Sequence, residues 1–132
     1  MANKIILYAE DNPDDMLILK MAFKRAGFAH ALHCVDDGQE AICWLRGDNR
    51  YADRKKYPLP DLLILDLKMP KKSGFDVLEW LKEKDELKHL PVVVLSSSDD
   101  ARDLKRTAAL GVTKYLQKSA LCEEVIGFLK TV

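Results

Sequence analysis

The chain has 132 residues, of which 48% are hydrophobic, 32% charged and 8% aromatic, a composition typical of one ordinary globular domain. Its 21 basic and 21 acidic residues give a formal net charge of zero, so no global field favours nucleic acid or an anionic membrane as a partner. Because no apolar run approaches the roughly 20 residues of a membrane span and acidic residues come too early for a signal peptide, we expect one cytoplasmic domain over residues 1–132, with neither a nucleic-acid nor a membrane partner.

Five short apolar runs predict β-strands. The third and fourth runs are almost continuously apolar, a pattern that favours strands covered on both faces in a parallel sheet. The strands are expected over residues 4–9, 31–35, 61–66, 91–96 and 112–117.

Segments with helical spacing separate these runs. Asn12 or Asp14 can cap the first helix, and Gly27 can end it. Strict alternation of strand and helix favours right-handed crossovers, so we predict an α/β fold of five βα units, a doubly wound five-stranded parallel sheet. The later helices are expected to begin near Gly38, Gly74, Ser98 and Ala120.

A polar segment, residues 47–60, separates the second helix from the third strand. It carries four basic side chains, those of Arg50, Arg54, Lys55 and Lys56. Long polar connections usually run over the surface, so we predict a surface loop with a helical turn.

The three cysteines are Cys34, Cys43 and Cys122. They are odd in number and show no metal-ligand spacing, and each lies in a mostly apolar stretch. We expect reduced residues in or near the core.

Polar side chains follow four of the predicted strands. Glu10 and Asp11 follow the first, Asp66 ends the third, Ser96 ends the fourth and Lys118 follows the fifth. The carboxyl ends of parallel strands meet at one edge of the sheet, where ligands bind in such folds. Three acids at that edge repel one another unless a cation lies among them, and their oxygens suit Mg²⁺. A hydroxyl and a lysine beside them suit a phosphoryl group.

Taken singly, each of these residues is a weak signal. An acid at a strand end is most often a solvated turn residue or a helix cap. Ser96 is equally compatible with a turn hydroxyl, and Lys118 with a solvated cation. Together they are a stronger signal, because the carboxyl ends of four predicted strands each carry a group suited to binding a cation or a phosphoryl group.

Four motifs at these strand ends resemble those of the receiver domains of two-component response regulators. The spacings from Asp66 to Ser96 and from Ser96 to Lys118 agree with compact members of that family, whereas the stretch before Asp66 is longer by about the length of 47–60, which therefore resembles an insertion. The resemblance implies a flavodoxin-like receiver fold with strand order 2-1-3-4-5. The motifs are YAEDNPDD (8–15), LILDLKMPKKSG (63–74), VVVLSSS (92–98) and YLQK (115–118).

The resemblance also implies how a phosphoryl group is accepted. Asp66 would be the phosphoacceptor, attacking a phosphohistidine of a sensor histidine kinase. Glu10 and Asp11 would hold Mg²⁺ together with Asp66 and the backbone carbonyl of Lys68. The chain would then be a phosphoacceptor signalling domain and no enzyme beyond Mg²⁺-dependent self-phosphorylation and self-dephosphorylation.

Three further residues would sense the phosphate. Lys118 would pair with one phosphoryl oxygen, Ser96 would donate a hydrogen bond to another, and Tyr115 would follow Ser96 inward. The negative charge of the phosphate would thereby change the conformation of the protein surface near these residues.

The output would be a protein–protein contact with a downstream target or a phosphotransfer domain, since no further domain is expected. The motif EDNPDD, the insertion and DLKMPKKSG most resemble single-domain regulators that accompany bacterial phytochrome-type sensor kinases. Such relatives often form homodimers through the fourth helix, fifth strand and fifth helix. That face alternates in charge, which is compatible with a dimer or with a solvated surface; its residues are Asp99, Asp100, Arg102, Asp103, Lys105, Arg106, Lys114, Glu123 and Glu124.

The chain departs from the family pattern in two places. Ser119 follows Lys118, where the family usually has proline, and Lys68 and Ser98 border the expected route of the hydrolytic water. We expect the second departure to alter the lifetime of the phosphate.

Two alternatives from other classes are open. A non-phosphorylated receiver-like docking module would keep the fold and lose the acids or the lysine. A flavin-binding protein of the same fold would need a phosphate-binding loop after the first strand, and the sequence EDNPDD at 10–15 would repel a phosphate there.

Overall fold

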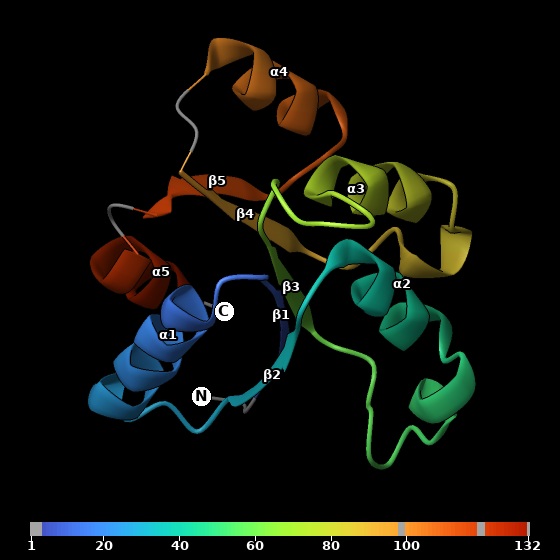
Figure 1. Cartoon of the computed structure of the whole chain (residues 1–132). Helices are drawn as coiled ribbons and strands as arrows, with labels where there is room; N and C mark the ends of the chain where they lie inside the picture. Colours follow the sequence, from blue (N-terminus) through green and yellow to red (C-terminus); the bar gives the residue numbers. More distant parts are fainter. Residues whose placement is uncertain (1–3, 98–99, 119–120, 132) are drawn as a thin grey trace.

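The computed structural model describes residues 4–97, 100–118 and 121–131, which form one five-stranded sheet flanked by helices (Figure 1). All strand pairs are parallel and the strand order is β2-β1-β3-β4-β5, which confirms the predicted topology. Each strand begins within two residues of its expected start. The strands are β1 (Ile5–Ala9), β2 (Ala31–Val35), β3 (Leu62–Leu65), β4 (Val92–Ser96) and β5 (Lys114–Gln117).

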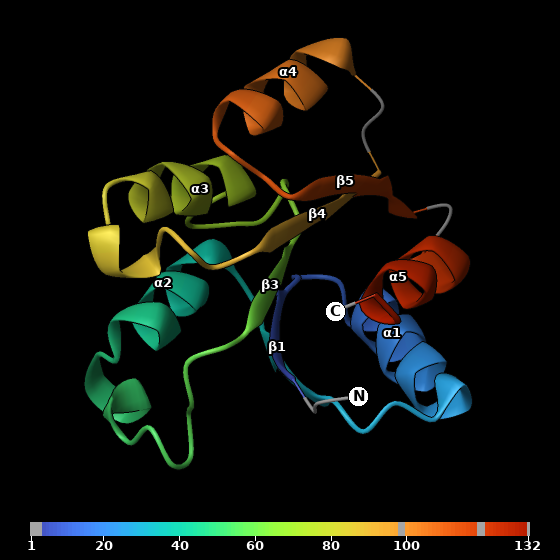
Figure 2. The ribbon, with the colours of Figure 1, turned by 180° about the vertical axis from the view of Figure 1, so that it is seen from behind.

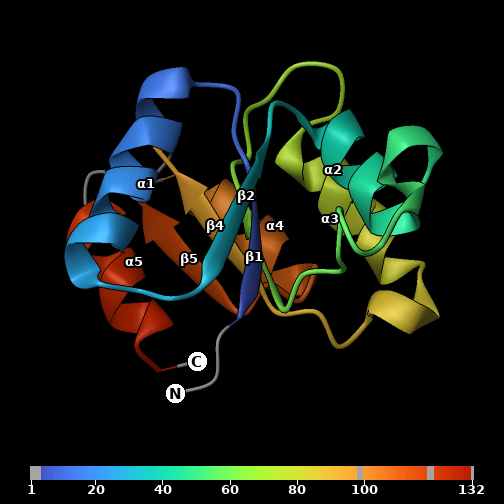
Figure 3. The same ribbon diagram turned by 90° about the horizontal axis from the view of Figure 1, so that it is seen from below.

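Five α-helices cover the two faces of this sheet, as the views from behind and from below show (Figures 2 and 3). α1 and α5 lie on one face, and α2 and α3 lie on the other. Alternate residues of the strands therefore enter two separate apolar cores, and β1 and β3 are buried from both sides. The helices are α1 (Pro13–Ala26), α2 (Gly38–Arg46), α3 (Gly74–Lys82), α4 (Ala101–Ala109) and α5 (Leu121–Leu129).

Side-chain caps fix where the helices begin. The Asn12 side chain accepts a hydrogen bond from the Asp14 amide, and Gly27 ends α1 in the left-handed conformation at φ 70°. The α4 helix begins at Ala101, three residues later than expected, because Asp100 caps it by accepting from the Arg102 amide. Ser98, where the start was expected, lies outside the described residues, as do Asp99 and Ser119.

The segment 47–60 has the predicted helical turn, a 3₁₀ helix over Asn49–Ala52. Most of the segment lies on the surface, but Tyr51 is buried and its ring packs against Trp44 of α2. Arg54 donates hydrogen bonds to the carbonyl oxygens of Trp44 and Leu45, at 2.7 and 3.0 Å. The Trp44 carbonyl also accepts from the Gly47 amide, so Arg54 adds a second donor there and supplies one to the Leu45 carbonyl in the last turn of α2.

Two cysteines fall where they were expected. Cys34 and Cys43 are free thiols, partly buried against the two cores. No helix in the described part of the chain is both long and apolar enough to cross a membrane.

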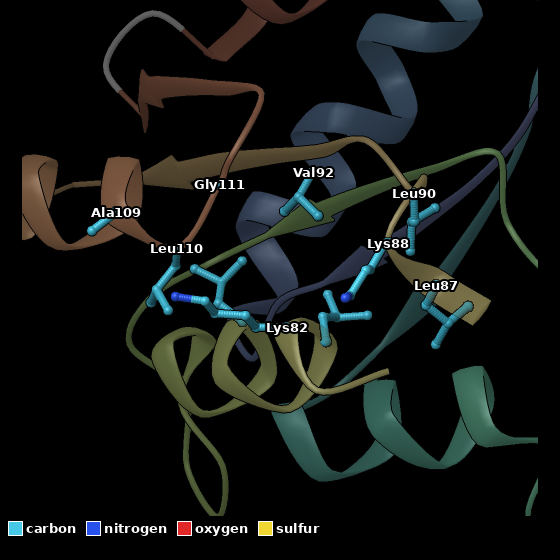
Figure 4. A pocket seen from close by; sticks show the side chains of 10 residues that line it. Lys82, Leu87, Lys88, Leu90, Val92, Ala109, Leu110 and Gly111 are labelled. Atoms are coloured by element: carbon cyan, nitrogen blue, oxygen red, sulfur yellow. The ribbon is translucent and has the colours of Figure 1, made fainter. Parts of the chain in front are cut away.

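A mainly apolar pocket of about 430 Å³ lies between α3, α4 and the first residue of β4 (Figure 4). Leu81, Leu87, Leu90 and Leu110 line it, and Val92 forms part of its wall. Because Val92 begins its strand, this pocket lies at the amino edge of the sheet. The polar residues predicted for the site lie at the opposite edge.

Candidate functional site

The two central acids of the site are held by the sheet itself. The Glu10 amide donates to the Val35 carbonyl at 3.0 Å, and the Asp66 amide donates to the Ala9 carbonyl at 3.1 Å. These bonds continue the strand ladders one residue beyond β1 and β3. Both acids are buried, with Glu10 fully so. Their backbone positions are therefore as fixed as those of the strands.

Glu10 occupies a polar niche within the core. Its carboxylate accepts hydrogen bonds from the Tyr8 hydroxyl at 3.1 Å and from the Asn12 amide at 3.2 Å, and one of its oxygens lies 2.7 Å from Lys118 Nζ. Burial, together with the charge of Asp66, raises the pKa of Glu10 to about 7 although Lys118 opposes the shift. Burial and the Glu10 charge also raise the pKa of the Tyr8 phenol well above its ordinary value, so it remains a donor.

Lys118 joins the acids into one cluster. Its ammonium lies 2.7 Å from Glu10, 2.8 Å from Asp15 and 3.3 Å from Asp66. Burial disfavours the charged ammonium, but the hydrogen bonds to Asp15 and Glu10 outweigh it and raise the pKa of Lys118 above its ordinary value. The lysine therefore stays charged, and its single positive charge is shared among three carboxylates.

Glu10, Asp11 and Asp66 also offer a set of metal ligands. One carboxylate oxygen from each lies within 4.8 Å of the other two. Oxygens on opposite sides of an octahedral Mg²⁺ lie about 4 Å apart, so small side-chain adjustments bring the set to coordination distance. Asp11 is exposed, in contrast to the two buried acids, and gives the set access to solvent. The donor set fits a hard divalent cation.

The other predicted residues lie around this cluster. Ser96 is buried at the last residue of β4, and the half-buried Tyr115 on β5 pairs with Val94 and packs against the core beneath α2 and α3. Lys68 is exposed, and its amide lies 3.5 Å from an Asp66 carboxylate oxygen. The structure thus brings Glu10, Asp11, Asp66 and Lys118 into one cluster and places the remaining predicted residues on adjoining segments.

Two residues of the cluster escaped the sequence prediction. Asp15 belongs to the motif at 8–15 but reaches Lys118 only because the first turn of α1 packs beside the end of β5. Tyr8 is a buried strand residue whose hydroxyl meets Glu10 two positions later, on the same side of the strand. The sequence signal for Tyr8 was its position two residues before Glu10 in the same strand. The sequence gives no comparable signal for Asp15, because its contact depends on how the first helix packs.

This arrangement has the parts that phosphoryl transfer needs. It offers a carboxylate nucleophile at Asp66, a fixed ammonium, and a donor set for a cation that can neutralise an incoming phosphate. The side chains of Glu10, Asp11, Asp66 and Lys118 lie together at the carboxyl edge of the sheet.

Comparison with known proteins agrees with this geometry. The family model of the response regulator receiver domain matches residues 6–129. Response regulator Rcp1 of Synechocystis sp. is 36% identical over 116 residues, which cover 88% of this chain and 77% of that protein.

Solved structures give the same result. The response regulator RPA3017 in red light signalling of R. palustris superposes with a TM-score of 0.88 at 32% identity, covering 97% of this chain and 92% of that one. The phosphorylated cyanobacterial phytochrome response regulator RcpA gives 0.85 at 37% identity, covering 98% and 91%. The Mn²⁺-bound form of Rcp1 gives 0.81 at 34% identity, covering 97% and 88%. The chain belongs to the receiver domain family of two-component response regulators, whose members are signalling domains.

Proposed function

We propose that this receiver accepts a phosphoryl group on Asp66 and signals through the surface that the phosphate rearranges. The observation that carries the proposal is the cluster in which Lys118 lies within 3.3 Å of Asp66 while Glu10 and Asp11 offer further oxygens to a cation. The phosphorylated relative RcpA supports it. We take residues 1–132 as one receiver domain in which 47–60 is an insertion, acting in the cytoplasm.

We assign Mg²⁺ as the cation, held by Asp11 and Asp66, with Glu10 acting mainly through a bridging water. Bound there, Mg²⁺ would neutralise charge on the nucleophile and on the incoming phosphate. Glu10 is already engaged by Tyr8 and Lys118, whereas Asp11 is exposed and available. The Mn²⁺-bound form of Rcp1 supports a divalent cation in a relative. The Lys68 carbonyl would complete the protein ligands.

The transfer itself needs only positioning from the protein. An Asp66 carboxylate oxygen forms a bond to phosphorus while the bond from phosphorus to the donor histidine nitrogen breaks, and that nitrogen keeps the electron pair. Lys118 is within reach of the phosphate because it already contacts the same carboxylate. The Ser96 hydroxyl would donate to another phosphoryl oxygen, and Tyr115 would move inward with it. Slow Mg²⁺-dependent self-phosphorylation and self-dephosphorylation at Asp66 belong to the same proposal.

We assign the phosphoryl donor to a sensor histidine kinase of the phytochrome type, as the red-light and phytochrome regulators among the relatives suggest. A docking face for it lies on α1, directly after the acidic loop. Leu17, Ile18 and Met21 are 41–55% exposed, and Met21 lies four residues after Leu17 and three after Ile18, on the same side of the helix. Clustered exposed apolar side chains mark interaction surfaces.

The output partner would be a downstream protein or a phosphotransfer domain. For the proposed homodimer through α4, β5 and α5, several of the charges expected to cross the interface have partners within the chain. Arg102 pairs with Asp100, and Arg106 pairs with Glu79 of α3. A dimer on this face therefore has to break these pairs within the chain or use the remaining charged residues of the face.

The phosphorylation site is tested with acetyl phosphate and Mg²⁺. Wild-type protein should gain one phosphate, which mass spectrometry locates at Asp66 after chemical trapping of the acyl phosphate. The Asp66→Asn variant should gain none, because its amide is a poor nucleophile. Undiminished labelling of the variant contradicts the assignment. Wild-type protein that takes up no phosphate under any donor would favour the docking module without phosphorylation.

The ligand assignment predicts that Asp11→Asn weakens Mg²⁺ binding by at least about tenfold, since a direct carboxylate ligand is lost. Titration calorimetry measures the affinity. Asp14→Asn is the matched control, because Asp14 is an exposed acid in the first turn of α1 and the charge change is the same. Equal affinities of the two variants would mean that Asp11 is no ligand.

The docking face predicts that Ile18→Asp slows phosphotransfer from a phytochrome-type kinase by about tenfold or more while acetyl phosphate still labels it at the wild-type rate. Leu59→Asp is the control, since Leu59 is 49% exposed but lies in segment 47–60. If Ile18→Asp and Leu59→Asp receive phosphate from the kinase equally fast, α1 is not the docking face.

A further inference from the structure

The loop that follows Asp66 is bracketed by the first residues of two helices. Residues 66–73 connect β3 to α3 and carry both the proposed phosphoacceptor and the Lys68 carbonyl. α3 begins at Gly74 and α2 begins at Gly38. Each of these glycines donates its amide to this loop: Gly74 to the Leu67 carbonyl at 2.9 Å and Gly38 to the Lys72 carbonyl at 3.1 Å.

The backbone at Gly74 lies against the phosphoacceptor residue. A Cβ added at this position would lie 2.3 Å from the Asp66 carbonyl oxygen and 2.7 Å from Leu67 Cα. The strand ladder holds the Asp66 backbone in place through its amide, and Leu67 follows directly. The reciprocal cap between Ser73 and Asp76 fixes the start of α3 from the other side. A side chain at residue 74 would therefore push on the backbone of Asp66.

Gly38 contacts the far end of the same loop. A Cβ there would lie 2.2 Å from the Lys72 carbonyl oxygen and 2.7 Å from its carbon. The loop has little freedom to withdraw, because Lys71 is in the left-handed conformation at φ 64° and Met69 is buried. Lys71 Nζ also lies 3.8 Å from a carboxylate oxygen of Asp37, the residue that caps α2.

The helices themselves do not require glycine at these positions. Neither residue has a positive φ, in contrast to Gly27, Gly47 and Gly111. Alanine has the higher helix propensity, so glycine here lowers helix stability. Close backbone approach is the feature that explains both glycines.

We infer that Gly38 and Gly74 are positioning residues, which hold the loop 66–73 in the geometry that places the Asp66 carboxylate and the Lys68 carbonyl for metal binding and phosphorylation. This inference rests on the proposed function of Asp66. To relieve a contact of 2.2–2.3 Å, the loop must shift by about 1 Å, a displacement large enough to reduce a catalysed rate by about two orders of magnitude.

The test compares Gly38→Ala and Gly74→Ala with Gly127→Ala. Gly127 lies in α5, and a Cβ added there meets no atom within 4 Å. For each variant, thermal unfolding, Mg²⁺ affinity by calorimetry, the rate of labelling by acetyl phosphate, and the amide resonances of Asp66 and Lys68 without metal are measured. All affinities are measured well below the unfolding temperature.

We expect Gly127→Ala to match wild type. Gly38→Ala and Gly74→Ala should bind Mg²⁺ about tenfold or more weakly, be labelled more slowly by at least the same factor and show displaced Asp66 and Lys68 resonances. The larger effect is expected at Gly74, whose contact is with Asp66 itself. A merely structural role would lower the unfolding temperature without changing the Mg²⁺ affinity of the folded protein.

Wild-type affinity and labelling in a folded Gly38→Ala protein would overturn the inference, whatever Gly74→Ala does. So would two alanine variants that both fail to fold, because the glycines would then serve folding and not the site. A wild type that is not labelled at Asp66 contradicts the proposed function instead, and the resonances of Asp66 and Lys68 still report whether the glycines place the loop.

Discussion

One ammonium group shared among three carboxylates is the interaction on which the site depends. Parallel strands deliver Glu10 and Asp66 to the same edge of the sheet, and the ladder bonds leave their backbones no freedom to separate. Two buried acids side by side are costly when both are ionised. Lys118 reduces this cost with one positive charge, while burial and the charge of Asp66 keep the pKa of Glu10 above its ordinary value. The unbalanced negative charge is what makes the edge receptive to a divalent cation.

The rest of the fold keeps this charge cluster in place. The buried β1 and β3 strands carry the acids, α1 contributes Asp15, and the helix starts at Gly38 and Gly74 close around the loop beyond Asp66. The opposite edge of the sheet has an apolar pocket and none of the site's acids. The apolar pocket and the acids are thus separated by the length of a strand.

The sequence was sufficient for those features that follow from strand alternation. Strand alternation predicted the parallel sheet and the meeting of Glu10, Asp66 and Lys118 at one of its edges, whereas the strand order came from the resemblance to receiver domains. The features that depend on the packing of one element on another were not predictable in this way. Asp15 reaches Lys118 only because the first turn of α1 lies beside the end of β5, and Arg54 of the insertion reaches the end of α2 through a tertiary contact. The start of α4 was expected near Ser98, whereas the helix begins at Ala101 with Asp100 as its cap.

The central claim, that Lys118 and a divalent cation neutralise the same carboxylates, is tested most directly by the free energy of unfolding of Lys118→Met with and without Mg²⁺. Removing one partner of a buried ionic cluster should destabilise the metal-free protein by about 2 kcal/mol or more, and saturating Mg²⁺ should recover at least half of that loss. Lys114→Met is the control, since Lys114 is exposed on β5, and it should differ little from wild type in either condition. A loss at Lys118 that is the same with and without Mg²⁺ would contradict the claim.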